Sequence, residues 1–212
     1  MKTILLAEPE FSKEAETLLK KHGKVIQYGS HRSFLKNLPK AEVIVTGLEE
    51  KLLKPALNSA PRLRLIGSRT TQLRYIDLPE CHRREIKVVN IKAESSVLKN
   101  TPSTAEETMA LILALSRNIP WAFNSIKRGK WERRKYGGTE IKGKTLGLIG
   151  FGRLGKLVAG YAHAFGMRIV AYDPFVPLVE VRRHNVRRVT LTELLKNSDI
   201  ISVVSKKNRE LF

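Results

Sequence analysis

Three glycines and one aspartate beyond the middle of the chain are spaced as in sites that bind a nucleotide. Gly150, Gly152 and Gly155 form a G-x-G-x-x-G motif, and Asp173 follows 18 residues after the last glycine. Such glycines permit a tight strand-to-helix turn, let backbone approach a pyrophosphate, and allow close packing of helix on strand. A carboxylate at the later position can accept hydrogen bonds from a ribose diol, and it would repel a 2′-phosphate. The motif therefore predicts a dinucleotide site that prefers NAD to NADP.

The segments around the motif have the pattern that such a site requires. The apolar run 145–149 predicts a strand before the glycines, and residues 154–165 predict a helix after them. The first amides of that helix, near Arg153 and Leu154, would attract an anion. Residues 167–172 predict a second strand that ends just before the carboxylate. A glycine turn without a ligand is the alternative, and the sequence context favours a cofactor site.

Before the motif, short apolar runs alternate with polar or amphipathic stretches. Five of the runs predict strands, and residues 11–21 predict a helix. Alternation of this kind is typical of a parallel sheet built from crossover units. We therefore expect an α/β protein with parallel sheets, made of one domain over residues 1–100 and another over residues 101–212. The five predicted strands cover residues 3–7, 24–27, 42–46, 63–67 and 87–90.

A long helix is predicted as the crossover between the two domains. Residues 104–119 carry a broad apolar face, and Thr104 with Glu107 has the form of a capping box at the start of the helix. Pro120 should end or kink this helix. A second helical stretch then leads to Trp131, which we expect to anchor the packing.

The chain is strongly basic, with 212 residues and a formal net charge of +19 at pH 7. Such a surplus favours anionic partners, including nucleic acid. The basic residues are spread along both halves, however, without a basic stripe interleaved with aromatics, so we interpret them as a solvated surface. Hydrophobic residues make up 42% and charged residues 28%, which is ordinary globular usage and argues against a disordered or fibrous chain.

The sequence offers little for other kinds of chemistry. Cys81 is the single cysteine, which excludes an internal disulfide framework and a cysteine-rich zinc site. The five histidines have no nearby carboxylate in a recognisable catalytic arrangement, and no metal-ligand spacing is present. We therefore assign no catalytic residue and no metal site. The apolar runs are far shorter than the roughly 20 residues that span a bilayer, so we expect a cytoplasmic protein without a membrane partner.

Several blocks of sequence before, within and after the glycine motif form one recognisable pattern. They cover residues 61–67, 75–78, 104–108, 115–120, 129–131, 143–155 and 165–174. Together they resemble the D-isomer-specific 2-hydroxyacid dehydrogenases, and among these the phosphoglycerate dehydrogenase-like branch. The resemblance is specific over residues 60–203 and looser over the first sixty residues.

The resemblance implies a flavodoxin-like, substrate-type first domain and a Rossmann dinucleotide-binding second domain, with an active-site cleft between them. It also implies hydride transfer between NAD and a 2-hydroxy or 2-keto acid, and a homodimer formed through the helix at 104–119. Thr71 matches a cofactor-contacting position of the first domain. Arg153, Leu154 and Asp173 match positions that contact the pyrophosphate and the ribose.

The chain also departs from the family pattern in its first domain. The family loop at Thr71 usually reads Thr-Gly-Leu followed by Asp or Asn, whereas Gln72 and Arg74 stand here. Gln72 replaces a glycine that we expect to need an unusual backbone angle. Glu85 stands where the family often has a glycine before a strand.

The family's catalytic Arg, Glu and His match no position in this chain. The second half of the cofactor domain and the segment that completes the first domain are not matched either. We therefore expect a C-terminally truncated family member, weak or inactive alone. Two alternatives stay open: a non-catalytic dehydrogenase-like protein that binds a protein or nucleic acid, and a truncated gene product without a stable function.

Overall fold

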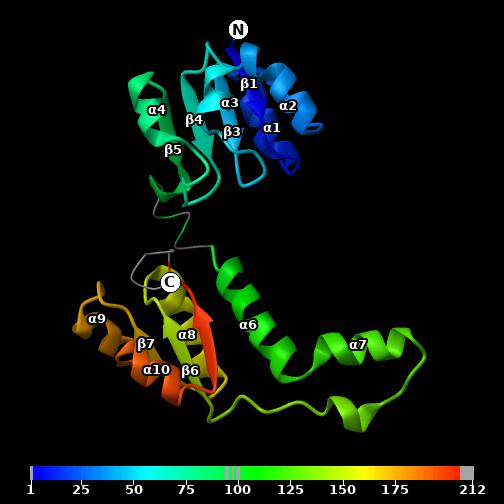
Figure 1. Cartoon of the computed structure of the whole chain (residues 1–212), viewed down its shortest axis with the longest axis vertical. Helices are drawn as coiled ribbons and strands as arrows, with labels where there is room; N and C mark the ends of the chain where they lie inside the picture. Colours follow the sequence, from blue (N-terminus) through cyan, green and yellow to red (C-terminus); the bar gives the residue numbers. More distant parts are fainter. Residues whose placement is uncertain (1, 94–95, 97, 99–100, 206–212) are drawn as a thin grey trace. The chain divides into compact units, whose positions relative to one another are not determined.

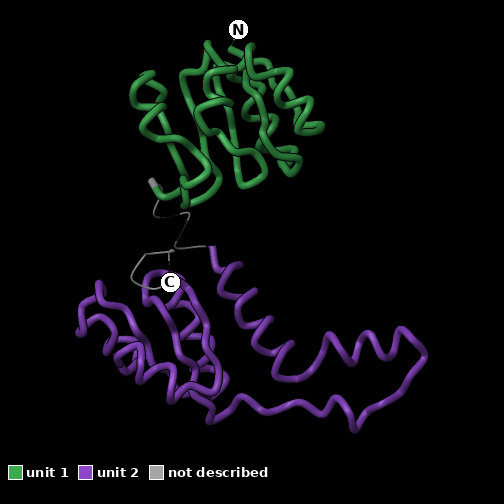
Figure 2. Tube along the Cα trace, viewed as in Figure 1, with its two compact units in different colours: residues 1–100 green, residues 101–212 purple. Residues whose placement is uncertain are grey.

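The computed structural model describes residues 2–93, 96, 98 and 101–205. The chain divides into two compact units, residues 1–100 and 101–212 (Figure 2). Each unit contains one sheet, and every strand pair in both sheets is parallel. The predicted fold class, α/β with parallel sheets, is therefore confirmed.

The first unit has a five-stranded sheet in the order β2-β1-β3-β4-β5 (Figure 1). This is the flavodoxin-like order, in which the strand order reverses between β1 and β3. All five strands predicted from the sequence are present, each within two residues of its predicted ends. The strands are β1 (Lys2–Leu6), β2 (Gly23–Ile26), β3 (Val43–Thr46), β4 (Leu65–Ser68) and β5 (Lys87–Asn90). The helices are α1 (Lys13–Lys20), α2 (His31–Asn37), α3 (Lys54–Asn58) and α4 (Leu78–Arg83).

The core of the first unit forms where the strands bury branched apolar side chains against the helices. Leu5, Ile44 and Ile66 come from three adjacent strands and are fully buried together with Phe34 of α2. Short polar caps fix where the helices begin: the Ser12 hydroxyl, for example, accepts the backbone N–H of Ala15 at 3.1 Å. Such a cap satisfies one of the amides that a helix start leaves without a partner.

The second unit has a four-stranded sheet in the order β8-β7-β6-β9, with α6 and α8 packed together beside it (Figure 1). Numbered from β6, the order is 3-2-1-4, which is part of the Rossmann order. The core combines Leu146 and Leu148 of β6 with Val158 of α8 and Met109 of α6. The strands are β6 (Thr145–Ile149), β7 (Arg168–Tyr172), β8 (Arg187–Arg188) and β9 (Ile200–Val203). The helices are α6 (Ser103–Ser116), α7 (Ile119–Lys127), α8 (Arg153–Ala164), α9 (Leu178–Arg183) and α10 (Leu191–Asn197).

The helical segment of the second unit corrects two sequence predictions. α6 begins after Pro102 without a side-chain cap, so the capping box predicted at Thr104 is wrong. Pro120 does not simply end a helix: it lies in the first turn of α7, where its missing N–H costs nothing. The two helices are separated at Asn118, whose φ of 55° breaks the helical path.

An exposed apolar surface runs along α6 and α7 and onto the turn that follows. We call it the apolar arm, and in Figure 1 its α7 part extends away from the sheet of its own unit. Trp131 is 81% exposed, so the prediction that it anchors the packing is wrong. The exposed residues of the apolar arm are Leu111, Leu115, Ile119, Trp121, Phe123, Ile126 and Trp131.

Two departures from the family pattern have different structural outcomes. Glu85, which precedes β5, has a φ of 56°, a region that side chains other than glycine, asparagine and aspartate rarely adopt. Gln72 is not among the residues with positive φ, so the loop does not have the unusual angle expected there. Backbone strain therefore lies at Glu85 and not at Gln72.

Candidate functional site

Two glycines of the motif are required by the turn between β6 and α8. Gly150 has a φ of 101°, and a Cβ there would lie 2.8 Å from the backbone nitrogen of Ser205. Gly155 lies on the first turn of α8, where a Cβ would come within 2.6 Å of the carbonyl oxygen of Gly150. Both contacts are closer than real Cβ atoms show. Glycine at position 155 therefore lets α8 approach the end of β6, and glycine at position 150 lets the segment after β9 approach the turn.

Gly152 serves a different purpose, because a Cβ at this position would meet nothing within 4 Å. It is the N-cap of α8, a helix of 12 residues, and no side chain caps the helix start. The positive end of the helix dipole and the open space beside Gly152 together suit an anionic group. The residues present at this turn therefore fit a dinucleotide pyrophosphate.

Asp173 follows β7 and reaches back to the glycine turn. Its Oδ2 atom accepts the backbone N–H of Phe151 at 2.8 Å, and its Oδ1 atom accepts those of Phe175 and Val176. A carboxylate has about four lone-pair sites, so acceptor capacity remains for a ribose hydroxyl. The carboxylate and the glycine turn are thus held in one fixed arrangement.

The remaining residues of the turn are held by packing in the core or by a hydrogen bond at the surface. Phe151 is completely buried, and its ring meets that of His184 edge-on, with the ring centroids 5.7 Å apart. Leu154 packs against the core of the second unit. The Arg153 guanidinium donates to the carbonyl of Thr101 at 2.9 Å, which ties the start of α8 to the segment before α6.

The seven residues predicted to contact the cofactor fall into two groups. Thr71 lies half-buried in the loop after β4 of the first unit, so its contact with a cofactor stays a prediction. The other six lie at the carboxyl ends of β6 and β7 in the second unit, the edge at which open α/β sheets bind ligands. These six are Gly150, Gly152, Arg153, Leu154, Gly155 and Asp173.

An ion pair between a buried carboxylate and a partly exposed arginine, at the carboxyl edge of the first sheet, is absent from the sequence predictions. Arg69, just after β4, donates through Nε to Oε1 of the buried Glu8 carboxylate at 2.5 Å, and through Nη1 to the carbonyl of Glu10 at 2.8 Å. This hydrogen bond to Glu8 raises the pKa of Arg69. Glu8 directly follows a buried strand, and that position was the only signal available from the sequence.

A second buried carboxylate at the same edge pairs with a histidine, a contact that was not predicted from the sequence. Oε2 of Glu50 lies 2.8 Å from Nδ1 of the exposed His31, and Oε1 accepts the Tyr28 hydroxyl at 2.9 Å. The hydrogen bond to Glu50 raises the pKa of Tyr28 above its ordinary value. This cluster was missed because Glu50 follows β3, whereas Tyr28 lies just before α2 and His31 is the first residue of α2, 22 and 19 residues earlier in the sequence.

Neither a membrane-spanning helix nor a metal-binding cluster is present within the described ranges. No helix there is both long and apolar enough to cross a bilayer. Nor do three or more His, Cys, Asp or Glu side chains gather there where they could hold a metal ion.

A glycine turn that joins the first strand of a parallel sheet to a helix, with a carboxylate after the next strand, defines the class of dinucleotide-binding proteins. Residues 4–119 match the family model of the D-isomer specific 2-hydroxyacid dehydrogenase catalytic domain. Residues 109–211 match that of the D-isomer specific 2-hydroxyacid dehydrogenase NAD binding domain. The chain therefore belongs to the D-isomer specific 2-hydroxyacid dehydrogenase family. The predicted family and its cofactor, NAD, are confirmed by these matches.

Individual relatives agree with this assignment. The chain is 38% identical to the D-3-phosphoglycerate dehydrogenase of Archaeoglobus fulgidus over 210 residues, which are 98% of this chain and 39% of that protein. It is 40% identical to the hydroxypyruvate reductase of Thermotoga maritima over 169 residues, which are 80% of this chain and 53% of that protein. The chain thus spans about two fifths to one half of the length of these relatives.

Among solved structures, the D-lactate dehydrogenase of Aquifex aeolicus, crystallised with NAD and lactic acid, is similar to this chain. The TM-score is 0.80 at 30% sequence identity, and the match covers 99% of this chain and 62% of the other.

Proposed function

We propose that this chain binds NAD through the glycine turn of its second unit, as part of a D-2-hydroxyacid dehydrogenase. The observation that carries this proposal is the 2.8 Å hydrogen bond between Asp173 and the backbone of Phe151, which fixes a ribose acceptor beside the phosphate turn. Bound NAD would exchange a hydride with a 2-hydroxy or 2-keto acid. The chain's own residues would orient the adenosine half: Asp173 accepts from the ribose, and the start of α8 faces the pyrophosphate.

We further propose that turnover by this chain alone is weak or absent. No residue of the sequence matches the Arg, Glu and His that the family uses to polarise the acid and move the proton. Retained NAD binding with little turnover is therefore the expected behaviour of the isolated chain. The cytoplasmic location remains a prediction from the sequence.

A pair of glycine substitutions on one helix tests the binding. A valine in place of Gly152 meets no protein atom near its Cβ, so Gly152→Val should fold but obstruct the pyrophosphate. Gly160 lies on the same helix, and its Cβ position is also open, so Gly160→Ala is the matched control. Calorimetric titration with NAD and ADP-ribose should give binding for the unsubstituted chain and Gly160→Ala, and at least tenfold weaker binding for Gly152→Val. Equal binding by all three would reject the site.

We also propose that a second copy of the chain covers the apolar arm. Seven large apolar side chains exposed along two consecutive helices and one turn form a patch of the kind that marks a protein interface. The match to the family supports a second copy as the occupant, since homodimers formed through this helix are what the resemblance implies. Mass measurement in solution tests the proposal.

A further inference from the structure

The short helix α9 contacts the surroundings of the glycine turn through two side chains. His184, the C-cap of α9, meets the residue before Gly152, and Glu180, in the first turn of α9, binds a residue of α8 that follows it. Neither belongs to the glycine motif, and no role at the site was predicted for either from the sequence. Together they hold both sides of the position at which a pyrophosphate would lie.

His184 holds the residue before Gly152. Its ring meets the ring of Phe151 edge-on, with the centroids 5.7 Å apart and the planes 75° apart. Aromatic pairs with centroids about 4.5–7 Å apart attract each other, and one such pair changes an equilibrium constant by about two- to tenfold. Phe151 is thus held at its backbone N–H by Asp173 and at its ring by His184.

Glu180 holds the residue that closes the first turn of α8. The backbone N–H of Lys156 donates to the carbonyl of Gly152 at 3.0 Å, and its ammonium group donates to Oε1 of Glu180 at 2.5 Å. The hydrogen bond from Lys156 lowers the pKa of the Glu180 carboxyl below its ordinary value. Both side chains of the pair are partly buried, so solvent screens it only in part. Gly152 therefore has a fixed neighbour on each side.

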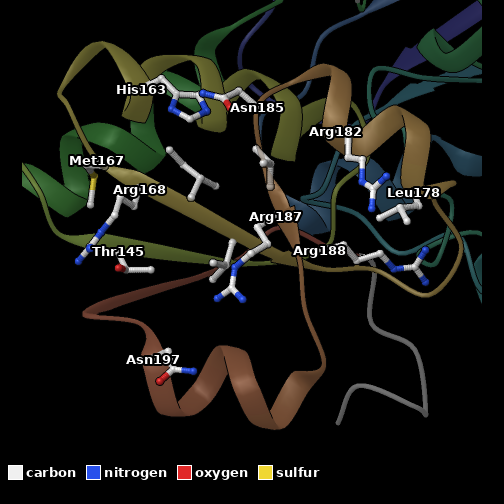
Figure 3. A pocket seen from close by; sticks show the side chains of 13 residues that line it. Thr145, His163, Met167, Arg168, Leu178, Arg182, Asn185, Arg187, Arg188 and Asn197 are labelled. Atoms are coloured by element: carbon white, nitrogen blue, oxygen red, sulfur yellow. The ribbon is translucent and has the colours of Figure 1, made fainter.

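The two contacts belong to one cluster of side chains. Nε2 of His184 lies 3.7 Å from Oε1 of Glu180, the same oxygen atom that binds Lys156. The carbonyl of His184 lies 3.2 Å from Nε2 of His163 on α8. Figure 3 shows His163 beside Asn185, the residue that follows His184. The position of the His184 ring is therefore fixed by α8 as well as by α9.

A purely structural role is the simpler explanation of these contacts. In that case they would stabilise α9, and their loss would affect every ligand of the second unit alike or none. The amides that would meet an anion, however, follow directly on Phe151, at the start of α8. A turn that is already held in one conformation loses less free energy when a ligand orders it. A positioning role therefore predicts a loss that is specific to the phosphate groups of a ligand.

We propose that His184, supported by Glu180, is a positioning residue of the NAD site that raises the affinity for the pyrophosphate and not that for the adenosine. This inference rests on the proposed function, since it concerns the same site. Asp173, which would accept from the ribose, is also held by its hydrogen bonds to Phe175 and Val176, outside this cluster. Loss of the His184 ring should therefore weaken the binding of ligands with a pyrophosphate and leave that of adenosine unchanged.

The test measures the binding of ADP-ribose by calorimetric titration and of adenosine by ligand-observed NMR, with the full chain and four variants. His184→Ala removes the ring, and His184→Phe restores an aromatic edge at the same position. Lys156→Gln/Glu180→Gln removes the ion pair without changing the net charge. Val179→Ala shortens an exposed side chain on the same helix and is the matched control. Circular dichroism checks that each variant folds.

We expect His184→Ala and the double variant to bind ADP-ribose about fivefold more weakly than the unsubstituted chain, the size expected for one aromatic pair. His184→Phe and Val179→Ala should bind it as the unsubstituted chain does, and adenosine should bind all five proteins alike. The inference is overturned if His184→Ala keeps its affinity for ADP-ribose, or if His184→Phe does not restore it. Equal weakening of ADP-ribose and adenosine would also overturn it, because that result indicates a purely structural role.

Failure of this inference differs from failure of the proposed function. An unsubstituted chain that binds neither ADP-ribose nor NAD rejects the proposed function, and the inference with it. An unsubstituted chain that binds both, with no change on His184→Ala, rejects the positioning role alone. If His184→Ala does not fold, the double variant decides the outcome: unchanged ADP-ribose binding after loss of the Lys156–Glu180 pair overturns the inference.

Discussion

Asp173 and Phe151 are joined by a 2.8 Å hydrogen bond from the backbone amide of the glycine turn to the carboxylate that follows the next strand. The turn that would hold the phosphates is therefore linked directly to the carboxylate that would accept from the ribose. A change at either residue should alter both stability and cofactor preference.

The variant Asp173→Asn tests this relationship. It removes the charge that repels a 2′-phosphate and weakens three backbone hydrogen bonds, each worth about 1 kcal/mol. We expect NAD affinity to fall about tenfold, the NADP-to-NAD affinity ratio to rise, and the unfolding temperature to drop. Titration with both dinucleotides and thermal unfolding measure these effects. An unchanged affinity ratio would show that the carboxylate does not face the ribose.

Relief of backbone strain should stabilise the first unit. Glu85→Gly removes the cost of a φ of 56°, which is about 1 kcal/mol, and should raise the unfolding temperature by about 3 °C. Asn118→Gly is the matched control, because Asn118 has a φ of 55° but asparagine tolerates this region. Thermal unfolding should therefore show a smaller gain for the control. A loss of stability on Glu85→Gly would mean that contacts of the glutamate side chain stabilise the fold by more than the positive φ costs.

The apolar arm should control the oligomeric state. We expect the unsubstituted chain to have twice its monomer mass of 24.0 kDa in light scattering coupled to gel filtration. Trp121→Glu combined with Phe123→Glu should give a folded monomer, because two charges would be buried without partners in the interface. Leu18→Glu on α1, an equally exposed apolar position outside the arm, should leave the dimer intact. A monomeric unsubstituted chain would rule out self-association.

Asp199 should make the stability of the folded chain depend on pH in the acidic range. Its hydrogen bond with the backbone N–H of Thr145 lowers the pKa of the carboxyl in the folded chain below its ordinary value. The stabilisation is therefore complete above the unfolded pKa of about 3.9 and is lost as the pH falls through the lower folded value. Asp199→Asn should flatten the decline of the unfolding temperature below about pH 4. The same slope in both proteins would show that other carboxyls control the acid response.

Local patterns carried most of the fold prediction. The strands of residues 3–7 and 145–149 were found because buried parallel strands are short, continuous apolar runs between breaks. β8 was not found, since Arg187 and Arg188 give no apolar signal and are recognised as a strand only by pairing with β7. The apolar residues of the arm likewise gave the signal of a packed core, as Trp131 illustrates, because a short stretch of sequence does not distinguish an apolar side chain that is buried from one that is exposed.

The candidate site likewise contains residues that a local motif predicts and contacts that only the folded chain forms. The glycines and Asp173 were predictable because the motif is local and each residue has its own backbone requirement. The Glu8–Arg69 pair spans 61 residues and forms only once the sheet order brings β1 and β4 to the same edge.

Phe151 occupies the variable position between the first two glycines of the motif, and it is completely buried. To open the turn, the chain would have to expose this ring, at a cost of about 2–3 kcal/mol. The turn is therefore rigid, although glycine is the residue with the most backbone freedom. A ligand that docks there would lose little free energy to ordering the backbone, because folding has already fixed the conformation of the turn.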